Sequence, residues 1–284
     1  MAAAASASSQ NTRRRLIINA DDFGFTNAVT AGILEAHAAG TVTSTSMMVH
    51  CPGWDDAVRR ASATPTLGIG LHLNLLVGKP FNNSPTLTNP RTGEFASLTT
   101  IVQRALTGRL SAAEITAECE AQLGALSAAG INCTHMDSHR HTHALPVIRG
   151  AVAAIASARR LPLRRPIEAH SRAGDVSSQL HRAVIAMSWR VTSVGAPLVK
   201  STDHFIGVSS QGSETFTADF ARAIDRLEPG STEFMVHPGH VDSALESIDR
   251  YTSERERELA ALTSPELRDR LHRDDLTLIS FAAL

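Results

Sequence analysis

Short β-rich runs alternate with longer alanine-rich helical patterns along almost the whole of this 284-residue chain. Alternation of this kind, without internal repeats or linkers, is typical of a parallel sheet whose successive strands are joined by helices. Residues 78–97 are rich in Pro, Asn, Ser and Thr and are predicted to form a long irregular loop. The pattern therefore predicts one α/β domain over residues 14–284.

The predicted strands are short and apolar, and several end at a polar residue. They cover residues 16–18, 42–49, 67–75, 133–137, 163–167, 203–206, 234–236 and 276–281. The predicted helices cover residues 27–39, 53–63, 145–160, 176–194 and 216–227, with two more between 98 and 130 and two charged ones before the last strand. Thr26 or Asn27 is the predicted cap of the helix at residues 27–39. Ser111 and Glu114 have the spacing of a capping box at the start of a later helix.

The composition favours a large globular domain without a nucleic-acid-binding surface. Hydrophobic residues make up 43% of the chain, and the formal net charge is −1. Cys51, Cys119 and Cys133 are odd in number and form no CxxC pattern, so we expect free thiols in a reducing compartment. Residues 1–13 are predicted to be a disordered tail. We find neither a transmembrane-length apolar run nor an export signal, so we expect a cytoplasmic protein.

Polar residues recur where the predicted strands end. Asp21 and Asp22 follow the first strand, His139 follows the fourth, and His237 follows the seventh. In a (β/α) barrel the carboxyl ends of the strands meet on one face, where the active site lies. A doubly wound open sheet is the alternative architecture. The absence of a GxGxxG turn after the first strand weakens nucleotide-binding versions of that alternative.

The pair Asp21 and Asp22 is the first candidate for chemistry. Neighbouring side chains on a strand point to opposite faces, so both carboxylates reach one site only if the chain turns there. At a strand end, one carboxylate could ligate a metal ion while the other meets a water molecule. An isolated pair of this kind is more often a loop or a helix cap. The apolar strand before it and the histidines elsewhere favour the metal site.

Two single histidines lie on otherwise apolar strands. His72, in the segment GLHL at residues 70–73, is either a buried core residue or a ligand, and the carboxylate pair favours a ligand. His237 leaves its strand just before a Pro-Gly turn, and its unperturbed pKa of about 6.5 suits a general acid or base. His240 lies beyond that turn and is the less favoured candidate.

The segment HMDSHRHTH, residues 135–143, is the densest group of metal-competent side chains. If it were extended, its polar members would share one face: His135, Asp137, His139, His141 and His143. At ~3.3 Å per residue they would span roughly 13 Å, too far for one ion with bonds of about 2.1 Å. At most two of them can touch one metal ion, and the strand end favours His139. The others are candidates to orient the ligands or to contact substrate.

Together these groups predict a hydrolytic metal enzyme. A divalent cation held by carboxylate and imidazole, with open positions, can turn water into a nucleophile. Arg164, Arg165 and Asp203 lie near strand ends and are candidates to orient a catalytic group, with surface ion pairs as the alternative. GxSxG, Walker A, HExxH and CxxC motifs are absent from the sequence, so serine-hydrolase, P-loop and zincin chemistry have no support.

The chain resembles the YdjC-like carbohydrate deacetylases. The resemblance rests on the segments IINADDFG, VTSTS, GLH, HMDSHRHTH and VHP, which fall in the family's order across about residues 14–240. It implies an irregular (β/α) barrel of the polysaccharide-deacetylase type. It also implies a divalent metal ion, magnesium or zinc, bound by one aspartate and two histidines.

Carried over position by position, the resemblance implies Asp22, His72 and His139 as the metal ligands. It implies Asp21 as the general base and His237 as the general acid. Four further residues are candidates to support the ligands or to contact substrate: Asp137, His141, His143 and Arg164.

The reaction that the resemblance implies is removal of acetyl from an N-acetylated amino sugar, such as a chitooligosaccharide or a glycolipid. Aromatic residues make up only 4% of the chain, and Phe23, Trp54 and Phe81 are among the few rings that could stack on a sugar. This scarcity favours a short or lipid-linked sugar over a long polymer. A homodimer is expected only because homodimers are common.

Two other functions stay open. A phosphoesterase could use the same histidine-rich barrel mouth, but such sites often hold two or three metal ions. A non-catalytic relative could use the pocket only to bind a sugar. The presence of Asp21 and His237 beside all three ligands speaks against pure binding, because a binding protein needs no acid–base pair.

Overall fold

A parallel sheet forms the centre of the protein in the computed structural model, which describes residues 13–168 and 176–284. Residues 1–12 of the predicted disordered tail lie outside the described residues. The strands are β1 (Arg14–Phe23), β2 (Ser44–Met47), β3 (Gly68–Leu73), β4 (Met136–Ser138), β5 (His204–Ile206), β6 (Gly230–Val236) and β7 (Leu276–Leu278). Their order is β4-β3-β2-β1-β6-β5, with β7 paired to the first residues of β1, and every pairing is parallel.

The two edges of this sheet approach each other through one connecting segment. Leu163 forms a parallel bridge to Met136 at the β4 edge, and Glu168 forms one to Phe205 at the β5 edge. The strands therefore curl into an irregular (β/α) barrel, which confirms the barrel prediction over the open sheet. The carboxyl ends of β1, β3, β4 and β6 consequently face a common region.

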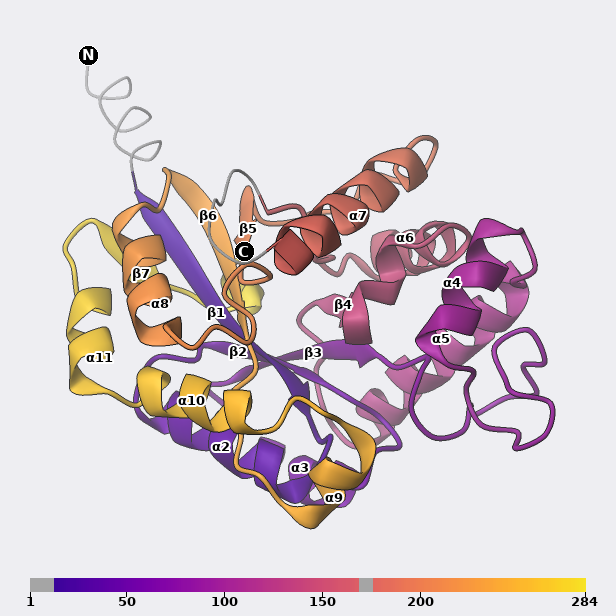
Figure 1. Ribbon diagram of the computed structural model, residues 1–284, viewed down its shortest axis with the longest axis horizontal. Helices are drawn as coiled ribbons and strands as arrows, with labels where there is room; N and C mark the ends of the chain where they lie inside the picture. The colour runs from indigo at the N-terminus through magenta and orange to yellow at the C-terminus, as the bar shows by residue number, and fades with distance from the viewer. Residues whose placement is uncertain (1–12, 169–175) are drawn as a thin grey trace.

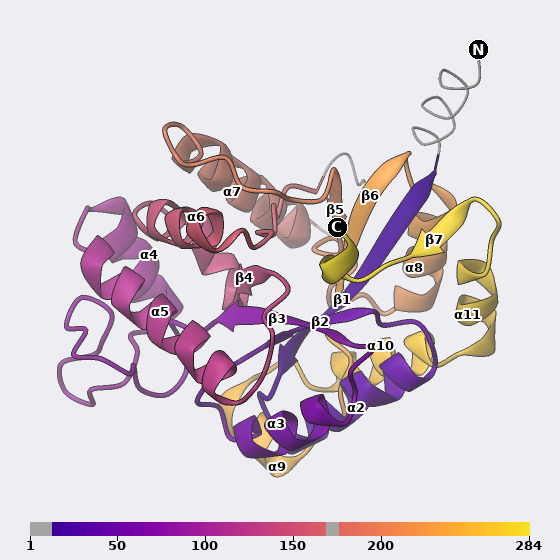
Figure 2. The same ribbon diagram turned by 180° about the vertical axis from the view of Figure 1, so that it is seen from behind.

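The helices surround the strands, as Figures 1 and 2 show from opposite sides. They are α2 (Asn27–Ala38), α3 (Trp54–Ser62), α4 (Leu98–Leu106), α5 (Ala112–Ala128), α6 (Ile148–Arg159), α7 (Val176–Thr192), α8 (Phe216–Asp225), α9 (Ser243–Ile248), α10 (Ser253–Leu262) and α11 (Pro265–Leu271). Helices α2, α3, α9 and α10 lie on one side, α4 to α6 on another, and α8 and α11 on a third (Figure 1). In the described part of the chain, no helix is long and apolar enough to cross a lipid bilayer.

Local capping agrees with the sequence except at one helix. Thr26 caps α2 by accepting a hydrogen bond from the Val29 N–H, and Ser111 caps α5 by accepting one from the Glu114 N–H. The Glu114 carboxylate, however, accepts hydrogen bonds from Thr86 of the long loop instead of returning to Ser111. The predicted capping box is therefore only half formed, because the loop offers its carboxylate a better-placed donor pair.

Several strands differ from their predicted bounds. The first was expected to end at residue 18, but β1 continues to Phe23 because Asn19 and the two aspartates find polar partners inside the barrel. Residues 163–167 form no strand, and only Leu163 and the following Glu168 make isolated bridges, since Pro162 and Pro166 have no N–H to donate to a ladder. The strand predicted at 133–137 begins only at Met136.

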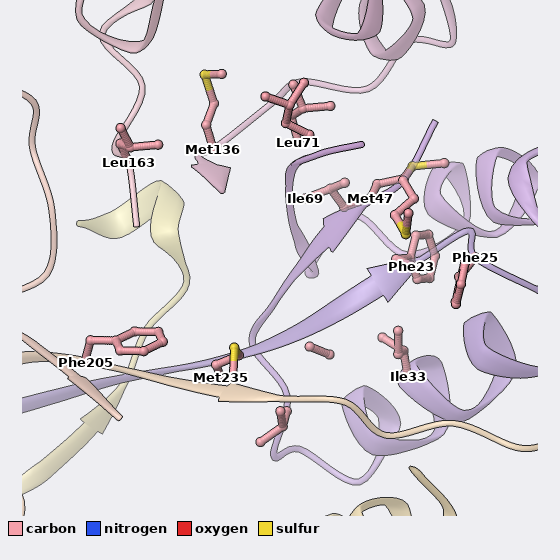
Figure 3. Close-up of a cluster of buried hydrophobic side chains, with 14 of the residues drawn as sticks. Phe23, Phe25, Ile33, Met47, Ile69, Leu71, Met136, Leu163, Phe205 and Met235 are labelled. Carbon is pink, nitrogen blue, oxygen red and sulfur yellow. The ribbon is translucent and has the colours of Figure 1, made fainter. Parts of the chain in front are cut away.

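The hydrophobic core fills the space between the strands and the helices. Figure 3 shows buried side chains from β1, β2, β3 and β4, including Phe23, Met47, Leu71 and Met136. Phe23 is fully buried in this cluster, so the expectation that it could stack on a sugar is wrong. All three cysteines are free thiols, as predicted.

Candidate metal and catalytic centre

A backbone irregularity at the end of β1 brings two neighbouring carboxylates into one buried cluster. The β1–β2 register shifts between Ala20 and Phe23, and Asp22 adopts a left-handed φ of 74°. Left-handed φ is uncommon for residues other than glycine, and a bulge breaks the alternation of side chains along a strand. Asp21 and Asp22 are both buried and both face the barrel interior. The irregularity between them is the turn that two neighbouring carboxylates need in order to reach one site.

Asp22, His72 and His139 converge from three different strand ends. The Asp22 Oδ1 atom lies 3.0 Å from His139 Nδ1 and 3.3 Å from His72 Nε2. Three donors that each lie about 2.1 Å from one ion are about 3.0 to 3.4 Å apart, for right-angled to tetrahedral arrangements. The spacing, the burial and the mixed carboxylate–imidazole chemistry of these residues therefore fit a divalent ion.

The groups behind these three residues fix their orientation. The His72 Nδ1–H donates to Asp137 Oδ1 at 2.7 Å, which leaves Nε2 facing Asp22. A carboxylate behind a histidine is the usual way to set the tautomer of a metal ligand. The second oxygen of Asp22, Oδ2, accepts a hydrogen bond from Arg255 Nη2 at 2.6 Å. Asp137 and Arg255 therefore hold His72 and Asp22 from behind, with the donor atoms of these two residues facing the proposed ion.

Asp21 has a different environment, because the buried guanidinium of Arg164 grips both of its oxygens. Arg164 Nη1 and Nη2 donate to Asp21 Oδ2 and Oδ1 at 2.7 and 2.6 Å. Burial alone would raise the pKa of Asp21, but Arg164 holds that pKa well below its usual value. Asp21 is therefore ionised over the whole physiological pH range.

Arg164 also makes one of the two candidate groups of metal ligands less favourable than the other. Asp21, His72 and Asp137 could in principle form a second cation site. Arg164, however, contacts Asp137 Oδ2 at 2.8 Å as well as Asp21, and a cation there would lie against its positive charge. The group containing Asp22 is the better metal site.

His237 lies at the end of β6 beside Asp21. Its Nε2 is 3.9 Å from Asp21 Oδ2, and burial lowers its pKa to about 4. The His237 backbone N–H donates to Glu258 Oε2 at 2.6 Å, and Tyr251 donates to the other oxygen of Glu258 at 2.5 Å. The imidazole is thus held in place and uncharged at neutral pH, next to an ionised carboxylate.

Comparison with known proteins places this centre in a family. The sequence pattern that defines the YdjC-like proteins matches residues 15–273. This chain belongs to the YdjC-like family. A carbohydrate deacetylase from Brevibacillus brevis is 35% identical to this YdjC-like protein over 274 residues, covering 95% of this chain and 99% of that protein. A carbohydrate deacetylase from Vibrio vulnificus is 32% identical over 270 residues, covering 95% and 96% of the two chains.

A solved structure gives the same picture of the fold. The crystal structure of a putative cellobiose-phosphate cleavage protein from Enterococcus faecalis superposes with a TM-score of 0.75 and 28% sequence identity. The match covers 95% of this YdjC-like chain and 98% of the other.

The histidine-rich segment of this YdjC-like protein is not extended, so the condition under which its polar members would share one face is not met. After β4 the chain enters a 3-10 turn, His139–Ala144, in which Arg140 and His141 have φ values of 52° and 54°. The turn leaves His139 at the site and gives His141 and His143 new directions. The every-second spacing of the histidines falls largely in this turn, so it does not indicate side chains on one face of a strand.

The other histidines of the segment pack among buried groups. His135 stacks on Phe281 with 3.9 Å between the ring centroids and belongs to the core. His143 Nδ1 lies 2.6 Å from Ser138 Oγ, and burial lowers its pKa to about 3. His141 lies edge-on to His143 with 6.1 Å between centroids. None of these three rings belongs to the candidate metal groups of the described residues.

Three candidates from the sequence lie away from the centre. Arg165 donates to the backbone carbonyl of Asp203, and the Asp203 carboxylate binds Ser231 near the start of β6, so neither orients a catalytic group. His240 pairs with Glu35 at the surface, as expected of the less favoured histidine.

Sequence reasoning missed several residues that build the centre. Arg255 is one of two arginines in the charged helix α10, and nothing local distinguishes it from Arg257. Glu233 on β6 contacts Arg164 Nη2 at 2.7 Å, and Glu258 on α10 holds His237. Ser46 donates to Asp137 Oδ2 at 2.8 Å, and the polar VTSTS segment on a predicted strand was the one available signal.

Proposed function

We propose that this chain is a metal-dependent hydrolase that removes the acetyl group from an N-acetylated amino sugar. The observation that carries the proposal is the buried Asp22, His72 and His139 group next to an ionised Asp21 and a neutral His237. The names of two relatives that align over almost the whole chain supply the substrate class. The substrate is accordingly a chitooligosaccharide-like or other acetylated amino sugar.

The three ligands would hold one magnesium or zinc ion. When bound, such an ion polarises the acetyl carbonyl and lowers the pKa of water toward neutrality. The two candidate groups found among the described residues share His72, so we expect one ion per chain. A stoichiometry of two or three ions would favour a phosphoesterase instead.

The chain's own residues then move one proton. Asp21 is ionised and accepts a proton from the attacking water. Asp21 has the lower pKa of the two groups, and the His237 Nε2 lies 3.9 Å from Asp21 Oδ2, so the proton passes on to the imidazole once the two groups come within hydrogen-bond distance. His237 then protonates the departing amine nitrogen, which leaves the sugar amine and acetate as products. Arg164 keeps Asp21 oriented through this exchange.

A matched pair of histidine variants tests the proposal. His72→Ala removes a buried ligand, whereas His240→Ala removes an exposed histidine that pairs with Glu35. Acetate release from N,N′-diacetylchitobiose should be lost in His72→Ala together with the bound metal, and unchanged in His240→Ala. Full activity of His72→Ala would overturn the assignment. Cytoplasmic location and a homodimer remain predictions from the sequence.

A further inference from the structure

Phe81 and His50 form an exposed aromatic pair on the loops that follow β3 and β2. Their ring centroids are 3.6 Å apart with an interplanar angle of 42°. Phe81 is 39% exposed and is the one aromatic residue among the large exposed hydrophobic residues of the described chain. In a barrel of this kind, the loops that follow the strands surround the active site. The pair therefore lies on the same face as the candidate metal centre.

A chain of buried hydrogen bonds connects Phe81 to the strand that carries His72. The Phe81 N–H donates to Glu118 Oε2 at 2.9 Å, and Gln122 Nε2 donates to Glu118 Oε1 at 2.8 Å. Gln122 then binds both the N–H and the C=O of Asn74, at 3.0 and 2.7 Å. Asn74 is two residues beyond His72 in sequence. Buried polar groups satisfied in this way hold the loop rigidly relative to the ligand strand.

The His50 side of the pair is tied to the neighbouring loop of the centre. The Gly53 N–H donates to the Gly24 carbonyl at 3.1 Å, which joins the loop after β2 to the loop after β1. In that second loop, the Phe25 ring lies 5.7 Å from the ring of His139. His50 itself has a left-handed φ of 61°, and such strain in a residue other than glycine is concentrated at ligand-binding sites.

We propose that Phe81, supported by His50, stacks on a second pyranose ring of the substrate, next to the sugar whose acetyl group is removed. This inference rests on the proposed function. The exposed face of an aromatic ring packs on the C–H face of a sugar, while polar groups nearby fix its orientation. Phe81 accordingly selects disaccharides or longer sugars over monosaccharides, and Glu118 is a positioning residue that holds its backbone.

The test compares a disaccharide with a monosaccharide. Phe81→Ala should raise KM for N,N′-diacetylchitobiose by about fivefold to tenfold, with little change in kcat. Kinetics with N-acetylglucosamine should stay the same, and Phe81→Tyr should restore the disaccharide KM. Leu106→Ala, which removes another exposed apolar side chain at the end of α4, is the control and should change neither KM.

Calorimetric binding of the disaccharide separates failure of this inference from failure of the proposed function. If the wild type releases acetate and Phe81→Ala leaves the disaccharide KM unchanged, the stacking role is wrong and the deacetylase stands. If the wild type releases no acetate but binds the disaccharide more tightly than Phe81→Ala does, the stacking role stands and the deacetylase is wrong. If the wild type neither releases acetate from the disaccharide nor binds it, both the stacking role and the deacetylase are wrong.

Discussion

Asp21 and Asp22 are neighbours of the same residue type, yet their surroundings differ completely. Asp22 presents one oxygen to two imidazole nitrogens and gives the other to Arg255. Asp21 has both oxygens bound by Arg164 and turns one of them toward His237. The left-handed φ of Asp22 separates the two environments. The comparison shows how a single bulge can place one carboxylate among imidazoles and its neighbour against a guanidinium.

Removal of the ligand carboxylate should have the largest effect. Asp22→Ala should lose the metal ion and reduce kcat/KM by at least about 10⁴-fold, because the water and the carbonyl both lose their activation. Metal content per chain and acetate release measure the two losses. Metal binding at wild-type affinity in this variant would break the distinction between the two aspartates.

Asp21→Asn should separate catalysis from metal binding. The amide keeps the shape of Asp21 but takes up no proton, so kcat should fall by about 10³-fold while the metal content stays at the wild-type level. The same two measurements apply. Equal loss of metal in Asp21→Asn and Asp22→Ala would mean that both carboxylates serve the ion.

The arginines behind the two aspartates should differ in their effect on folding. Arg164 contacts three buried carboxylates, those of Asp21, Asp137 and Glu233, so Arg164→Met leaves them without compensation. The free energy of unfolding should fall by about 3 to 5 kcal/mol. Arg255→Met removes a partner from only two carboxylates, Asp22 and Asp249, and Asp249 keeps Arg140, so this variant should cost less. Urea unfolding of both variants gives the comparison, and a larger loss for Arg255→Met would contradict it.

Metal binding should release a proton from His72, which lies beside Asp22. Burial alone would lower the pKa of His72, but Asp137 and Asp21 raise it to about 10 in the metal-free protein. His72 is therefore protonated at neutral pH and must lose that proton before it can bind the ion. Below the raised pKa, metal affinity should rise about tenfold per pH unit. Calorimetry in two buffers of different ionisation enthalpy measures the released proton, and affinity independent of pH would contradict the prediction.

The sequence predicted those features that depend on local pattern. The βα alternation predicted a parallel α/β domain. The polar strand ends at Asp21, His72 and His237 favoured a barrel and pointed to the residues that the structure brings together. Thr26 as a helix cap followed from its own chemistry. These features need only short stretches of chain, so a single sequence contains them.

The features that the sequence could not supply depend on distant contacts or on left-handed backbone. Arg255 reaches Asp22 across 233 positions, and no local pattern marks it. The turn after His139 requires left-handed φ at Arg140 and His141, residues with no strong preference for it. Pro166 interrupts the edge strand that the apolar pattern predicted. A long-range contact decided the first of these cases and left-handed backbone the second, whereas Pro166 was present in the sequence.

The most direct test of the account is a metal titration of the chelated wild-type protein. Acetate release from N,N′-diacetylchitobiose should be absent after chelation, should rise as magnesium or zinc is added, and should saturate at one ion per chain. Full acetate release from the metal-free protein, or saturation only at two or more ions, would contradict a single ion held by Asp22, His72 and His139.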